Sequence, residues 1–350
     1  MVHGPARGGE PVFLFEAGTG RYRRAGAQWR WPILSPDGTQ AVWFDRSGPS
    51  EPFEVMTWKL DDPHSNPVRT TLSFPGTPAA FLSEHGERLA TVSDGLMSVY
   101  DLGSGASIAS ARIDEKRSYV RGFFVDRDHF RLFRPNRWRG PSERGRIDIL
   151  EFDVSTKILS TTGSIEDSQD FGLRATASGD RLLVREKSRL SLRDGRSGAL
   201  IVSLLERDPK ERMPDARFLS DGRIVAVVAS KPNVVIEVFA QDGRHERTIA
   251  IPAHDRITLG AEAAPGKLIV AGGGASNESL SRTIFLADLS SGEVLQVADR
   301  LFPVAYFASF LSNMPNYLPA PGSEASKLFY GPQRSLVHFD PSTGERRVLL

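Results

Sequence analysis

The chain has 350 residues, with 44 Lys or Arg against 43 Asp or Glu, and 40% of it is hydrophobic. This length is enough to bury the core of one all-β domain, and 32 glycines with 23 prolines suit a fold rich in strands and turns. The balanced charge gives no reason to invoke nucleic acid, and the lack of cysteine excludes disulfides, Cys-ligated zinc and a Cys nucleophile.

The N-terminal region and the longest apolar stretch carry no targeting or membrane signal. Residues 1–11 are expected to form a tail, and they lack the apolar centre of a signal peptide. The apolar stretch 301–311 is too short to span a bilayer and fits a buried strand better. We therefore expect a cytoplasmic protein that makes no membrane contact.

One turn signature, Asp-x-x-Ser/Thr-Gly, recurs along the chain and joins short apolar strands. An Asp can accept hydrogen bonds from N–H groups just ahead of it, and the Gly supplies a positive φ. The mean spacing between Gly20 and Gly344 is about 46 residues over seven intervals, which fits a four-stranded propeller blade. The full copies are 101–105, 288–292 and 340–344, and the looser copies are 16–20, 59–62, 153–157, 194–198 and 241–243.

A second kind of tight turn alternates with the first and is expected to join the two inner strands of each blade. Examples are Ser35-Pro-Asp-Gly38 and Ser220-Asp-Gly222, each followed by an apolar run. The pattern predicts an all-β fold, a β-propeller over 12–350. Its expected blades are 30–73, 77–113, 119–163, 170–206, 213–251, 256–298 and 303–350.

The number of blades depends on an extra outer hairpin at 12–24. Seven inner hairpins against eight outer ones favour seven four-stranded blades plus this N-terminal hairpin. The hairpin would then seal the ring. The alternative is that it is the remnant of an eighth blade.

Three segments resemble the repeats of degenerate WD40-like propellers of the bacterial kind. Val99-Tyr-Asp-Leu-Gly-Ser-Gly105 matches the end of such a repeat, and Ser35-Pro-Asp-Gly38 matches its inner turn. Ala253-His254-Asp255 is similar to the Gly-His that opens a repeat, without the Gly. Lactonase-like propellers and the heavy chains of quinone-dependent amine dehydrogenases share such motifs, so the resemblance implies the fold and no particular function.

The loop at 134–146 is the strongest candidate for a binding surface. Residues 112–146 hold eleven Lys or Arg against five acids, and Arg with Trp is the pair most enriched at binding hot spots. Long loops at 45–52 and 272–282 should open on the same face of the propeller as the loop at 134–146. The expected partner-binding residues are Arg134, Arg137, Trp138, Arg139, Arg144 and Arg146.

The central channel is the second candidate, because charged residues occur in the innermost strands. Such residues either face the wet channel or pair with a neighbour. A small anionic ligand could bind there. The expected channel-lining residues are Arg121, Arg174, Asp215 and Arg217.

The motifs of common enzymes do not occur in the chain. Its seven histidines show no paired metal spacing, and no Gly-x-Ser-x-Gly or Walker loop is present, so we expect neither a metal nor a cofactor. The sequence favours a protein interaction scaffold that binds an acidic or mixed protein surface. A lactonase-like or other hydrolase with its site at the channel mouth is the alternative. Binding of nucleic acid or another polyanion through 112–146 is the third reading.

Overall fold

The strands form because short runs of apolar residues are closed by turn residues. β8 (Arg88–Ser93) and β9 (Leu96–Asp101) hold five and four consecutive buried positions. Between them, Asp94 and Gly95 have φ angles of 46° and 76°, the left-handed geometry of a two-residue hairpin. Strands that are buried on both faces in this way belong in the middle of a sheet covered on both sides.

A computed structural model places these strands in space. It describes residues 11–16, 21–27, 33–35, 37, 39–45, 53–59, 62, 66–72, 78–113, 121–136, 145–168, 173–176, 178–186, 188–206, 215–230, 233–252, 257–272, 282–303, 327–330 and 335–348. Statements about structure below refer to these residues.

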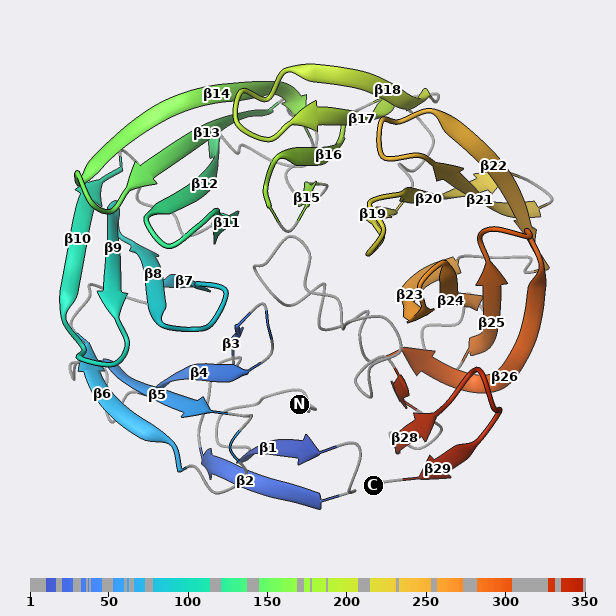
Figure 1. Ribbon diagram of the computed structural model, residues 1–350, viewed down its shortest axis with the longest axis horizontal. Helices are drawn as coiled ribbons and strands as arrows, with labels where there is room; N and C mark the ends of the chain where they lie inside the picture. Colours follow the sequence, from blue (N-terminus) through green and yellow to red (C-terminus); the bar gives the residue numbers. More distant parts are fainter. Residues whose placement is uncertain are drawn as a thin grey trace.

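Six consecutive groups of four antiparallel strands form blades 1 to 6, numbered along the chain. Within each blade the first strand lies nearest the centre of the disc and the fourth lies at its rim (Figure 1). Blade 1 is β3 (Ile33–Leu34), β4 (Gln40–Asp45), β5 (Phe53–Lys59) and β6 (Val68–Leu72). Blade 2 is β7 (Ala79–Leu82), β8, β9 and β10 (Ser107–Arg112). Blade 3 is β11 (Arg121–Phe124), β12 (His129–Asn136), β13 (Gly145–Asp153) and β14 (Ile158–Ser168).

The next three blades repeat this order. Blade 4 is β15 (Arg174–Ala175), β16 (Arg181–Arg185), β17 (Arg189–Asp194) and β18 (Leu200–Glu206). Blade 5 is β19 (Ala216–Phe218), β20 (Ile224–Ser230), β21 (Asn233–Phe239) and β22 (His245–Ile251). Blade 6 is β23 (Ile257–Ala264), β24 (Lys267–Gly272), β25 (Arg282–Asp288) and β26 (Val294–Pro303).

Blade 7 begins on the same strand that ends blade 6. The early part of β26 pairs with β25, whereas Phe302 and Pro303 pair with β27 (Leu328–Tyr330). Just before that change of partner, Arg300 has a φ of 59°, which marks the bend. β28 (Leu336–Phe339) and β29 (Arg346–Val348) complete the blade.

The N-terminal hairpin has its own place in the ring. β1 (Pro11–Glu16) and β2 (Arg21–Ala27) pair with each other in a two-stranded sheet. They lie between blade 1 and blade 7, with β2 at the rim and β1 inside it (Figure 1). The all-β propeller with seven blades and an extra N-terminal hairpin is therefore confirmed, and so is the resemblance to WD40-like propellers at the level of the fold.

The hydrophobic core is divided among the contacts between blades. Six clusters of buried side chains occur among the described residues, and each draws on two consecutive blades, from blades 1 and 2 through to blades 6 and 7. Phe81 and Phe130, with ring centroids 5.5 Å apart, join blades 2 and 3 in this way. Burial of apolar area between neighbouring blades is therefore what holds the disc together.

The recurring outer turn forms the hydrogen bonds that its sequence predicts. In the turn at 288–292, Asp288 Oδ1 accepts hydrogen bonds from the backbone N of Ser290 and Ser291 at 2.9 and 3.0 Å, and from Ser290 Oγ at 2.6 Å. These hydrogen bonds, that of the Ser290 side chain first, lower the pKa of Asp288 to about 2, so the carboxylate stays ionised at neutral pH. Gly292 closes the turn with a φ of 82°.

One copy of the outer turn has a non-glycine residue at a position with a positive φ. In the looser copy at 153–157, Lys157 stands where the full turns have glycine, yet its φ is 61°. A side chain in this left-handed region is strained, and glycine is not. We expect Lys157→Gly to raise the free energy of unfolding by about 1 kcal/mol, measured by urea unfolding.

Gly344, at the same place in blade 7, is the matched control. Its φ is 75°, and an added Cβ would meet nothing within 4 Å, so Gly344→Ala changes only the conformational preference. It should lower the free energy of unfolding by about 1 kcal/mol. If Lys157→Gly left the urea midpoint unchanged while Gly344→Ala lowered it, the strain assigned to Lys157 would be absent.

Candidate functional site

The two faces of the disc differ in which connections they carry. Because the strands of a blade are antiparallel, the inner and outer hairpins share one face. The connections from second to third strand, and from blade to blade, share the other. We call this second side the loop face. The described strand ends that flank the long loops singled out in the sequence, those of β4 and β5, β12 and β13, and β24 and β25, lie on it.

The described stem of the 134–146 loop lies on blade 3. Arg134 lies on β12 opposite Asp148, and Arg146 lies on β13 opposite Asn136. Arg134 Nη2 donates to Asp148 Oδ2 at 2.9 Å, and Arg146 Nε donates to Asp148 Oδ1 at 2.7 Å. Arg146 Nε also lies 3.6 Å from Glu166 Oε1.

This stem is less positive than its arginines suggest. The Asp148 side chain is only 5% exposed, so both guanidinium groups serve to neutralise a buried carboxylate. Arg146 remains about half exposed and can still contact a partner. The other predicted residues of this surface, Arg137, Trp138, Arg139 and Arg144, lie outside the described residues.

Two of the four predicted channel residues join neighbouring blades. Arg217 is 5% exposed, and its guanidinium donates to the backbone O of Gly260 and Leu259 in blade 6, at 2.7 Å each. Arg121 Nη1 donates to the backbone O of Leu173 at 3.0 Å, just before blade 4. Their guanidinium groups therefore donate hydrogen bonds to backbone carbonyl oxygens of the next part of the ring and do not stand free in the channel.

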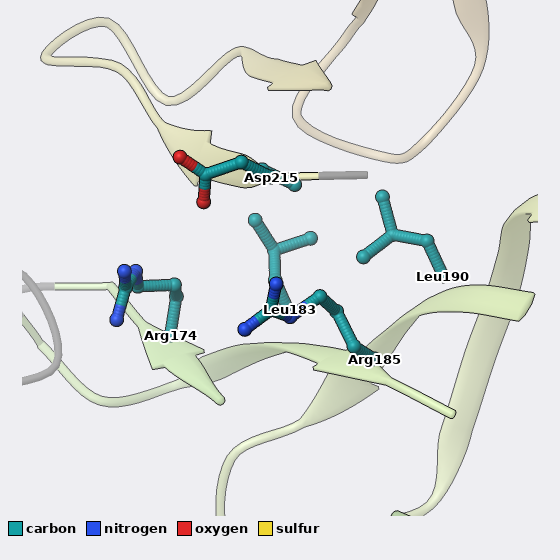
Figure 2. A pocket seen from close by; sticks show the side chains of 6 residues that line it. Arg174, Leu183, Arg185, Leu190 and Asp215 are labelled. Carbon is teal, nitrogen blue, oxygen red and sulfur yellow. The ribbon is translucent and has the colours of Figure 1, made fainter. Parts of the chain in front are cut away.

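The other two predicted channel residues come together at one cleft. Arg174 begins β15 of blade 4, and Asp215 immediately precedes β19 of blade 5. Both line a shallow cleft; its empty space of about 200 Å³ includes open solvent, and it encloses no room for a water molecule. Figure 2 shows Asp215 across the cleft from Arg174, with Leu183 between their two strands.

The sequence did not indicate the third charged residue of this cleft, Arg185. It ends β16, the second strand of its blade, opposite Leu190. Its side chain enters the cleft beside that of Arg174 (Figure 2). Its position could have indicated it. The last residue of a second strand and the first residue of an innermost strand both lie at the loop face, so Arg185 and Arg174 are expected on the same side of the disc.

Other features that often accompany a site are absent from the described part of the chain. No three His, Asp or Glu side chains there are grouped so that they could hold a metal ion. The described residues also form no helix of the length and apolarity needed to cross a membrane.

Comparison with known proteins gives matches in structure alone. No protein-family model matches the chain, and no curated protein matches its sequence. Porphyromonas gingivalis dipeptidyl peptidase 4 is similar with a TM-score of 0.61 at 13% identity, over 93% of this chain and 53% of that one. The chain thus spans about half the length of the peptidase.

Two further solved structures match over greater shares of their own length. A eukaryotic initiation factor has a TM-score of 0.60 at 13% identity, over 97% of this chain and 83% of that one. An oligogalacturonate lyase in complex with manganese has a TM-score of 0.50 at 12% identity, over 99% and 97%. These likenesses establish the fold. Because the neighbours include a peptidase, a lyase and an initiation factor, they leave the function open.

Proposed function

We propose that the chain is a protein interaction module whose loop face binds an acidic or mixed surface of a partner protein. The observation that carries this proposal is the gathering of arginines on the loop face of two adjacent blades. Arg134 and Arg146 lie at the stem of the long loop of blade 3, and Arg174 and Arg185 are the blade 4 residues at the cleft between blades 4 and 5. Guanidinium groups bind carboxylates through two parallel hydrogen bonds, which favours an acidic partner.

The blades that carry these arginines are firmly joined. Thr162 Oγ1 donates to the backbone O of Arg196 at 2.9 Å, and Arg131 Nη1 donates to the backbone O of Gly179 at 2.7 Å. Each of these hydrogen bonds crosses from blade 3 to blade 4. A surface held on rigid elements loses little freedom when a partner binds, which suits a scaffold.

The test is a pull-down of the tagged chain from a cytoplasmic lysate, with and without nuclease, followed by mass spectrometry. We expect a stoichiometric protein partner that survives nuclease. The triple variant Arg137→Ala, Trp138→Ala, Arg139→Ala should weaken its recovery at least tenfold, because Trp and Arg anchors carry most of the energy of an interface.

The control replaces Arg346 and Arg347 with alanine. Both are exposed on β29 at the rim of blade 7, away from the loop of blade 3. Unchanged recovery with the triple variant would contradict the assignment of the 134–146 loop. A partner lost on nuclease treatment would indicate nucleic acid instead, and an empty pull-down would favour a small ligand of an enzyme at the channel mouth.

A further inference from the structure

The chain holds five Asp-Gly pairs, and one of them differs from the others in its hydrogen bonds. In such a pair the backbone N of the glycine can attack the aspartate side chain, because glycine has no Cβ to hinder the approach. The fold decides which pairs react, since a carboxylate or an N–H group that is held by hydrogen bonds must first be released. The pairs are Asp37-Gly38, Asp94-Gly95, Asp194-Gly195, Asp221-Gly222 and Asp242-Gly243.

Three of the pairs are held at both reacting groups. In the pairs that begin at Asp194, Asp221 and Asp242, the glycine N donates to a backbone O at 2.7, 3.0 and 2.9 Å. In the same order, the carboxylate accepts a hydrogen bond from the backbone N two residues ahead at 3.1, 3.0 and 3.0 Å. The carboxylate of Asp37 is bound in the same way by Thr39 N at 3.0 Å, and the glycine of that pair lies outside the described residues.

Asp94-Gly95 lacks both restraints. Asp94 is exposed, and its carboxylate makes no hydrogen bond or ion pair with any described residue. Gly95 N donates to no described residue either. The pair forms the two-residue tip between β8 and β9 on the loop face of blade 2, and Ser93 pairs with Leu96 at its base.

The backbone of this tip also favours a change of conformation. Asp94 has a φ of 46°, in the left-handed region that disfavours a residue with a Cβ. Ring closure needs rotation about the Cα–C bond of Asp94, and no hydrogen bond of the two reacting groups opposes that rotation. The tip can therefore reach the reactive geometry while the strands below it stay paired.

We propose that Asp94 is a site of spontaneous isomerisation to isoaspartate, and that hydrogen bonds protect the pairs at Asp194, Asp221 and Asp242. Gly95 N attacks Cγ of the protonated Asp94 carboxyl group. The N–Cγ bond forms, and the carboxyl OH leaves with the amide hydrogen as water, which gives a five-membered succinimide. Water then adds to the backbone carbonyl carbon of Asp94 and breaks its bond to Gly95 N, so the main chain passes through Cγ and gains one carbon. This site does not depend on the proposed function.

The added main-chain carbon falls beside a contact that the tip makes with the next part of the chain. Gly95 O accepts a hydrogen bond from Ile113 N at 2.8 Å, and Ile113 is 4% exposed in the core between blades 2 and 3. Isomerisation moves Gly95 by the length of one bond, which should break this hydrogen bond. Because Ile113 begins the connection to blade 3, the isomer should loosen the loop face where that connection starts.

The experiment incubates the purified full chain in neutral buffer below its unfolding transition and digests samples taken over time. Electron-transfer fragmentation in the mass spectrometer distinguishes isoaspartate from aspartate in each Asp-Gly peptide. We expect isoaspartate to accumulate at Asp94 at least about tenfold faster than at Asp194, Asp221 or Asp242, because each hydrogen bond that must open raises the barrier. The succinimide should appear in the same Asp94 peptide as a species that has lost one water.

Two controls separate the effect of the fold from the chemistry of the sequence. Incubation in urea removes the hydrogen bonds, so all five pairs should then isomerise at rates within about threefold of one another. Asp94→Glu should form no isomer at this position, because attack on the longer side chain needs a six-membered ring, which closes more slowly. Hydrogen exchange of the Ile113 N–H should become faster on ageing in the unsubstituted chain and stay constant in Asp94→Glu.

The proposal is overturned if Asp194, Asp221 or Asp242 isomerises as fast as Asp94 in the folded chain. It is also overturned if Asp94 leads by the same factor in urea, because the difference would then belong to the sequence and not to the fold. Isoaspartate that forms at Asp94 in urea but not in the folded chain would show that the tip is held, which again contradicts the assignment. Unchanged exchange of the Ile113 N–H would overturn the effect on the connection to blade 3.

Discussion

Replacing Gly163 with alanine is expected to lower the free energy of unfolding by about 3 kcal/mol or more. Gly163 lies in β14, at the rim of blade 3, where the outer turn of blade 4 rests against it. A Cβ added at this position would lie 2.1 Å from the backbone O of Ser197 and 2.3 Å from its carbonyl carbon. Backbone atoms cannot rotate away as a side chain can, so the two blades must separate.

The contacts around Gly163 raise the cost of that separation. Thr162 Oγ1 donates to Arg196 O at 2.9 Å, and Arg196 Nη2 donates to Glu151 Oε1 of blade 3 at 3.2 Å. Moving the turn far enough to admit a methyl group would stretch both hydrogen bonds. A loss of hydrogen bonds would then add to the steric cost.

Gly103→Ala provides the control for this prediction. Gly103 also lies in an outer turn, that of blade 2, and an added Cβ there would approach only Asp101 Oδ1, at an ordinary 3.4 Å. Urea unfolding followed by intrinsic fluorescence should show a large loss for Gly163→Ala and less than about 0.5 kcal/mol for Gly103→Ala. Equal effects of the two substitutions would mean that the blade contact tolerates the added methyl group.

The fold could be predicted because its signals are local. In the outer turns of blades 3, 4 and 6 the Asp accepts hydrogen bonds from the backbone N–H groups two and three residues ahead, and in those of blades 2 and 7 it accepts one of the two. Apolar runs between the turns have the length of a strand, and the spacing of the turns gives the number of strands in each blade. No contact between distant residues was needed for this inference.

The candidate site was only partly predictable because it depends on contacts between blades. Arg174 and Arg217 both lie in innermost strands, and the sequence pattern predicts the same channel-lining position for both. In the structure Arg217 reaches the carbonyl groups of the next blade, whereas Arg174 faces the cleft. Which of these occurs depends on the height of each residue in its strand and on the backbone of the neighbouring blade, and neither is encoded in local spacing.

The buried ion pair of blade 4 links the stability of the fold to the cleft. Glu186 follows Arg185 directly, and its side chain is 5% exposed. Glu186 Oε1 accepts hydrogen bonds from Ser191 Oγ and Arg193 Nη2 at 2.7 Å each, and Arg189 Nε donates to its other oxygen. This network holds the connection from β16 to β17, so it also sets the position of the Arg185 backbone.

Glu186→Leu is expected to lower the free energy of unfolding by about 3–5 kcal/mol. The substitution leaves the Arg193 guanidinium, which is only 10% exposed, without its carboxylate in a place that little water reaches. A second substitution, Arg193→Met, removes that charge. The double variant should therefore be more stable than Glu186→Leu alone, because an apolar pair of similar volume has no desolvated charge.

Arg189→Gln is the control for the charge pair, because Arg189 binds the same carboxylate from a side chain that is 36% exposed. We expect it to cost less than about 1 kcal/mol in the same urea unfolding measurement. If the double variant were as unstable as Glu186→Leu, the loss would come from packing around Glu186, and the buried charge of Arg193 would not be its cause.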